Sequence, residues 1–164
     1  MRKKRTSAAA LTAAFLCACA AGGRTAPLEG PSPQSDDPVI GRPFRVELPR
    51  GGERTLRLEG VRGRITLVCV LGESAERVAD ACAGVRERWR DRVAMVGIWV
   101  GEPGDLTGLP FRAYVDPGGE SLRRELQIDP RSQVLVLDVR GRLVRRLGLD
   151  ELDALQDDIA RRLP

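Results

Sequence analysis

The sequence predicts an α/β fold, a three-layer α/β/α sandwich around a mixed sheet, from two apolar stretches and the helical pattern between them. Residues 65–71 (ITLVCVL) are nearly all apolar, which is typical of a central strand buried on both faces, and residues 92–100 (RVAMVGIWV) form a second such strand. Between them, residues 74–90 place apolar side chains four, three and four positions apart, as one face of a helix requires. A strand, a helix and a strand in this order form a right-handed parallel crossover.

Shorter elements flank this crossover. The strands expected at 44–48 and 54–59 alternate apolar and polar residues, and a turn sequence at 49–52 joins them into a hairpin. Ser74 is a candidate N-cap for the first helix. Beyond the crossover, the sequence predicts a strand at 112–115, a helix at 120–126, a hairpin of strands at 133–138 and 142–146, and a last helix from Asp150 to about residue 162. The C-terminal hairpin adds antiparallel strands, so the sheet is mixed, with helices on both faces.

The N-terminus has the pattern of a targeting segment. A basic run at 2–5 (RKKR) precedes an apolar stretch at 8–18, which is shorter than the ~20 residues that a membrane-spanning helix needs. The stretch ends in Leu16-Cys-Ala-Cys19, which resembles the lipobox of bacterial lipoproteins. That resemblance implies a signal peptide at 1–18 and a lipid on Cys19. One alternative is an ordinary secretory signal peptide in which Cys19 has no special role. The other is an uncleaved N-terminal anchor, which the short apolar stretch disfavours.

Residues 19–40 are rich in Gly, Pro, Ser, Ala and Asp, so they cannot bury enough apolar surface to fold. We expect them to form a flexible tether between the lipid and a single domain at 41–164. Ala20 stands after Cys19, where lipoproteins retained in the inner membrane commonly have an aspartate. We therefore expect a lipid-anchored protein of the cell envelope with its domain in the periplasm, and favour the outer membrane over the inner.

The basic character of the chain does not indicate a nucleic-acid partner. The formal charge is +4, with 27 basic and 23 acidic residues, but four of the basic residues lie in the cleavable run at 2–5. The remaining chain has equal numbers of both signs, intermixed along the sequence, which is typical of a solvated surface. The expected contacts are therefore the membrane, through the lipid on Cys19, and an unidentified envelope protein.

The residues available for catalysis are few. The chain has no histidine, which excludes Ser-His-Asp and Cys-His nucleophile pairs and every metal site that needs imidazole. The cysteines are Cys17, Cys19, Cys69 and Cys82, and no two of them form a CxxC. We expect neither a metal nor a cofactor.

Several phrases in order resemble the thioredoxin-like superfamily, specifically its extracytoplasmic TlpA-like and AhpC/TSA-type redoxins. The phrases are Gly41-Arg-Pro-Phe44, Ile65-Thr-Leu-Val68, residues 109–119 (LPFRAYVDPGG) and residues 134–144 (VLVLDVRGRLV). The resemblance covers about residues 41–146. It implies the same sandwich fold and, in active members, a CxxC at the start of the first helix, where the helix N-terminus stabilises a thiolate.

The active-site motif itself is missing. Residues 72–78 (GESAERV) stand where the resemblance places the dithiol, and they contain no cysteine. In the peroxiredoxin version, Arg77 stands at the position of the peroxidatic cysteine, and Cys82 at that of a resolving cysteine found in one branch. The superfamily also has a cis-proline opposite the dithiol, about six residues before an aspartate. Pro130, eight residues before Asp138, is the candidate for that proline.

Cys69 and Cys82 have three interpretations at this point. They are small apolar core residues, or they form a structural disulfide between strand and helix, or they are a relocated redox pair. Two functional hypotheses follow. The preferred one is a membrane-anchored binding or accessory module of the envelope that has lost its dithiol. The other is an envelope thiol-disulfide oxidoreductase, or a peroxiredoxin-like antioxidant protein, that uses Cys69 and Cys82 as catalytic residues.

Overall fold

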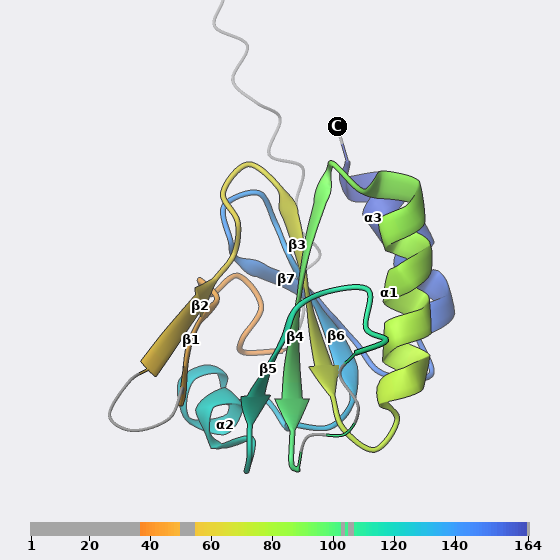
Figure 1. Ribbon diagram of the computed structural model, residues 1–164. Helices are drawn as coiled ribbons and strands as arrows, with labels where there is room; N and C mark the ends of the chain where they lie inside the picture. The colour runs from red at the N-terminus through yellow and green to blue at the C-terminus, as the bar shows by residue number, and fades with distance from the viewer. Residues whose placement is uncertain (1–36, 50–54, 103, 105–106, 164) are drawn as a thin grey trace, which may run out of the picture. The chain divides into compact units, whose positions relative to one another are not determined.

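A five-stranded mixed sheet in the order β5-β4-β3-β6-β7 is the centre of the domain (Figure 1). The computed structural model describes residues 37–49, 55–102, 104 and 107–163. The strands of the sheet are β3 (Ile65–Leu71), β4 (Val93–Val100), β5 (Ala113–Asp116), β6 (Gln133–Leu137) and β7 (Leu143–Leu147). The central strand β3 pairs in parallel with β4 and antiparallel with β6. The predicted crossover and the predicted C-terminal hairpin are both confirmed.

Helices cover both faces of this sheet, which confirms the three-layer sandwich. On one face lie α1 (Ala75–Trp89) and α3 (Leu155–Arg162), side by side in Figure 1. On the other lies α2 (Glu120–Leu126), next to a separate two-stranded sheet of β1 (Arg45–Pro49) and β2 (Thr55–Glu59). The predicted N-terminal hairpin therefore forms, but it packs against α2 and does not join the main sheet.

Alternation along β3 divides the apolar residues into two cores. Successive side chains of a strand point to opposite faces, so odd and even positions of β3 enter different layers. The core on the α1 side contains Leu67, Cys69, Leu71, Val78, Cys82 and Val85, and the core on the α2 side contains Val68, Val70, Leu122, Leu126 and Ile128. The predicted apolar face of the first helix is confirmed by these members.

The last helix begins later than the sequence predicts. Residues Leu152–Ala154 form a 3-10 turn, and the α-helix starts only at Leu155. No side chain caps either start, and a short 3-10 turn is a common way to arrange the first unpaired amides of a helix without a cap. Leu152 is buried, so apolar burial keeps this turn against the core although it is not α-helical.

The chain packs onto the domain before the predicted boundary at residue 41. Val39 is buried in the α2-side core, and Asp37 forms an ion pair with Arg146 of β7 (3.3 Å). Gly41 then donates its amide to the carbonyl oxygen of Leu143, which fastens this segment to the sheet. Residues 37–40, which the sequence analysis assigned to the tether, are thus in contact with the folded domain. In the described part of the chain, no helix has the length and apolarity needed to cross a bilayer.

Candidate functional site

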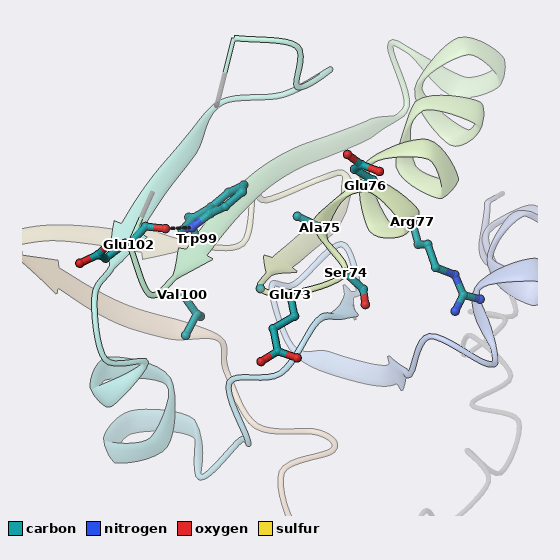
Figure 2. Close-up of a pocket in the computed structure, with 9 residues that line it drawn as sticks. Glu73, Ser74, Ala75, Glu76, Arg77, Trp99, Val100 and Glu102 are labelled. Atoms are coloured by element: carbon teal, nitrogen blue, oxygen red, sulfur yellow. Dashed lines mark hydrogen bonds between the residues drawn. The ribbon is translucent and has the colours of Figure 1, made fainter. Parts of the chain in front are cut away.

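The candidate site lies at the carboxyl ends of β3 and β4, where the chain leaves the sheet and enters α1. An open pocket of about 680 Å³ is lined there by Gly72, Glu73, Ser74, Ala75, Glu76, Arg77, Trp99, Val100 and Glu102 (Figure 2). The loops that follow the parallel strands lie at this edge of the sheet, which is where open α/β sheets bind their ligands. The pocket is also the place where the sequence resemblance puts a dithiol.

Ser132, just before β6, holds the loop between β3 and α1 in place. Its hydroxyl oxygen accepts hydrogen bonds from the backbone amides of Gly72 (3.0 Å) and Ser74 (3.2 Å). Ser132 is buried and directly precedes β6, so the loop before β6 is fixed to the start of α1. Ser74 stands at the predicted N-cap position, but its side chain makes no capping bond. The predicted N-cap position is therefore confirmed, while the side-chain bond that usually accompanies it is absent.

The polar side chains of the pocket carry mainly negative charge. Glu73, Glu76 and Glu102 supply three carboxylates, and Figure 2 shows them pointing in different directions. Arg77 is the one cation of this lining, and its guanidinium turns away to donate to the carbonyl oxygen of Leu149 (3.1 Å). The indole N–H of Trp99 donates to the backbone oxygen of Glu102 (2.7 Å), which holds the ring against the pocket. The carboxylates thus face solvent around an aromatic wall.

A second open pocket adjoins the first and shares Gly72, Glu73, Ser74 and Val100 with it. It has a volume of about 610 Å³, and its other side consists of Arg123, Asp129, Pro130, Arg131, Ser132, Gly148, Leu149 and Asp150. The two pockets lie on either side of these shared residues, and together they are called the depression below. Among the described residues, no group of His, Cys, Asp or Glu side chains is arranged to hold a metal ion.

The two candidate cysteines are neighbours beneath this surface. Cys69 lies in β3 and Cys82 two turns into α1, and their sulfur atoms are 2.8 Å apart. Both side chains are 0 % exposed and both are thiols in this structure. The prediction that strand and helix bring these residues together is confirmed. Neither cysteine lines the pockets, so they are not a dithiol at the site surface.

Their environment opposes thiolate chemistry. Burial raises the pKa of the Cys69 thiol well above its ordinary value of 9.0, and the hydrogen bond and charge interaction with Cys82 raise this pKa further. A thiolate is the species that attacks disulfides and peroxides, and exchange also requires access to the partner. Cys69 therefore lacks both the ionisation and the access that a redox nucleophile needs.

The expected cis-proline at Pro130 is wrong. No peptide bond of the described residues is cis. The resemblance places the cis-proline about six residues before Asp138, and that position holds Ser132, which binds the start of α1 as described above. A cis peptide bond before a residue other than proline costs about 3 kcal/mol, so a serine at this position favours the trans form. Ser132, like Trp99 and Glu102 of the first pocket, is a site residue that the sequence did not predict.

Comparison with known proteins identifies the fold. No protein-family model and no curated protein matches the sequence. Among solved structures, the chain is similar to a protein assigned as the thiol:disulfide interchange protein DsbE from Chlorobium tepidum, with a TM-score of 0.58, 14% identity, and coverage of 76% of this chain and 96% of that one. It is also similar to the thioredoxin domain of a thiol-disulfide oxidoreductase from Bacteroides vulgatus (TM-score 0.50, 10% identity, coverage 76% and 96%).

A third similar structure is a thioredoxin-like superfamily protein, with a TM-score of 0.51, 18% identity, and coverage of 77% of this chain and 99% of that one. The domain therefore has the thioredoxin-like fold, as the order of motifs predicts. The same fold supports many functions, so function has to be argued from the site. The candidate lipidation site Cys19, the signal peptide at 1–18 and the tether up to residue 36 lie outside the described residues.

Proposed function

We propose that this protein is a thioredoxin-fold lipoprotein, anchored through Cys19, whose domain binds another protein of the cell envelope and performs no thiol chemistry. The observation that carries the proposal is the start of α1. Ala75 is the first residue of the helix and Val78 lies one turn further, and neither position nor the loop before them has a sulfur atom. The scaffold is present while its nucleophile is absent.

The depression at the same edge supports a binding role. It is open, it has the aromatic wall of Trp99, and the carboxylates of Glu73, Glu76 and Glu102 surround that wall. Aromatic rings are enriched in protein interfaces because they bury a large area at small entropic cost. Since negative charge dominates here, electrostatic complementarity favours a partner segment that carries lysine or arginine.

The second candidate function is an envelope thiol-disulfide oxidoreductase, or a peroxiredoxin-like protein, that uses Cys69 and Cys82. The 2.8 Å separation of their sulfur atoms is the observation in its favour. Complete burial of both thiols and the raised pKa of Cys69 count against it, because a substrate disulfide cannot reach either sulfur in the folded domain.

Insulin-reduction and peroxide-consumption assays on the purified protein distinguish these functions. We expect the wild type to show no turnover above that of a Cys69→Ala/Cys82→Ala variant. A positive control is the variant Ala75→Cys/Val78→Cys, which places a CxxC at the first turn of α1, where the helix N-terminus lowers the pKa of a thiol. Turnover by the wild type that disappears in either Cys69→Ala or Cys82→Ala would establish the oxidoreductase instead.

Capture of the partner tests the binding role directly. The tethered protein, cross-linked in cells and purified, should retain an envelope protein that a Glu73→Lys/Glu76→Lys variant loses. An Asp80→Lys/Glu87→Lys variant has the same change of charge at two exposed positions of α1 that line neither of these pockets, and it serves as the control. Equal retention by both variants would show that the depression is not the binding surface.

A further inference from the structure

The distance between the sulfur atoms of Cys69 and Cys82 is shorter than the van der Waals contact distance of two unbonded sulfur atoms. They are 2.8 Å apart, and a disulfide bond is about 2.05 Å long, so a small movement of either side chain joins them. The elements that carry them are fixed by independent packing. β3 is the central strand of the sheet, and Val78 and Val85 on either side of Cys82 are buried in the same core as Cys69. The packing of β3 and α1 therefore fixes the two sulfur atoms close together, and neither of them lies on a loop.

Nothing else in the surroundings gives these thiols another role. Both are 0 % exposed within the apolar core on the α1 side, and the hydrogen bond between them is the polar contact that each makes in the described part of the chain. Burial and the neighbouring thiol of Cys82 are the causes of the raised pKa of Cys69, and neither of them stabilises a thiolate. A catalytic pair needs access and a stabilised thiolate, whereas a structural pair needs only proximity.

We propose that Cys69 and Cys82 form a structural disulfide that locks α1 onto the central strand when the chain folds in an oxidising compartment. The closed loop runs from β3 through the candidate site to the second turn of α1, so the bond fixes the base of the depression at both ends. The inference rests on the proposed function only for the location, because disulfides persist outside the cytoplasm and are rare within it.

The oxidation must precede the final packing of α1. Each thiol loses one proton and one electron as the S–S bond forms, and a disulfide-bearing oxidant accepts both electrons and both protons and leaves as a dithiol. Such an oxidant forms a mixed disulfide with one cysteine first, and neither sulfur is accessible once the core has closed. The oxidant therefore acts on the unfolded or partly folded chain, and the completed bond is shielded from later reduction.

The redox state of the two cysteines is measured by alkylating the denatured protein without reductant and mapping its peptides by mass spectrometry. We expect the protein purified from cells that produce it from its full-length sequence to yield one cross-linked pair of peptides containing Cys69 and Cys82, without alkylation at either position. The same chain, reduced, unfolded and refolded with oxidised glutathione, should give the same product. Free thiols at both positions in both preparations would overturn the disulfide.

Failure of the location gives a different result. A bond that forms on refolding with glutathione but is absent from the protein purified from cells would support the disulfide site and would contradict the envelope location. A second measurement tests the order of events. Reduced protein that is already folded should oxidise far more slowly with glutathione than protein refolded in its presence, and equal rates would show that the folded domain exposes its thiols.

Stability provides an independent readout. In the chain-entropy model, closing a loop of this length lowers the equilibrium constant for unfolding by about a hundredfold. We expect the oxidised protein to lose about that factor on reduction, while a Cys69→Ala/Cys82→Ala variant shows no response to the reductant. An equal response of both proteins would mean that the reductant acts elsewhere and that the bond does not lock the fold.

Discussion

Ser132 connects the loop after β3 to the loop before β6. Its hydroxyl accepts the amides of Gly72 and Ser74, which follow β3, while its own backbone leads directly into β6. In the resembled superfamily this position belongs to a cis-proline, which has no side-chain hydrogen-bonding group. In this chain the serine hydroxyl instead braces the loop before β6 against the start of α1.

Replacing Ser132 by alanine should destabilise the domain. The substitution leaves two amides without an acceptor, and since both lie at half-buried residues, water replaces part of the lost bonding. We expect a decrease of about 1–2 kcal/mol in the free energy of unfolding, measured by urea titration. Ser121→Ala is the control, because Ser121 is a serine of equal burial whose hydroxyl makes no hydrogen bond among the described residues. Equal stability of the two variants would show that the brace contributes nothing.

At the scale of elements, the sequence predicts most where one physical signal dominates. The apolar run of β3 and the helical spacing of α1 are such signals, because burial on two faces or on one leaves a direct pattern in the residues. The start of the last helix is harder to predict, since the apolar spacing continues through the 3-10 turn and does not reveal which backbone amides are paired.

The candidate site shows the same limit more clearly. Residues 72–78 could be placed at the start of a helix, and the absence of cysteine there is visible in the sequence. The role of Ser132 was not predictable, because its partners are about 60 residues away and a serine before a strand has no distinctive local pattern. Likewise, the two-stranded sheet of β1 and β2 was predictable as a hairpin, while its packing against α2 depends on tertiary contacts.

Gly119 determines how α2 approaches the loop before β6. It precedes the helix with a φ of +67°, and a Cβ atom at this position would lie 2.4 Å from the Cβ atom of Pro130. An alanine here would have to adopt a left-handed backbone conformation, and its methyl group would clash with the proline ring. We therefore expect Gly119→Ala to destabilise the domain by about 2–4 kcal/mol. Thermal unfolding measures the effect. Gly108→Ala is the control, because no atom lies within 4 Å of its Cβ position, and it should be nearly neutral.

At the scale of the whole molecule, the charge distribution follows the proposed topology. The basic run at 2–5 lies in the expected signal peptide, and the rest of the chain is formally neutral. A neutral domain has no strong electrostatic attraction to an anionic bilayer surface. Under the proposed function, residence at a membrane would therefore depend on a lipid at Cys19.

The anchor is tested by changing each cysteine of the expected signal sequence in turn. We expect Cys19→Ala to abolish acylation and to leave the protein outside the membrane fraction after detergent partitioning, because removing the modified residue removes the source of membrane affinity. Cys17→Ala is the matched control: Cys17 lies two residues earlier in the same apolar stretch, and its loss should leave acylation intact. Membrane partitioning by Cys19→Ala equal to that of the wild type would show either a different anchor or an uncleaved N-terminal segment. In the second case the variant would keep residues 1–18, which N-terminal sequencing of the purified protein detects.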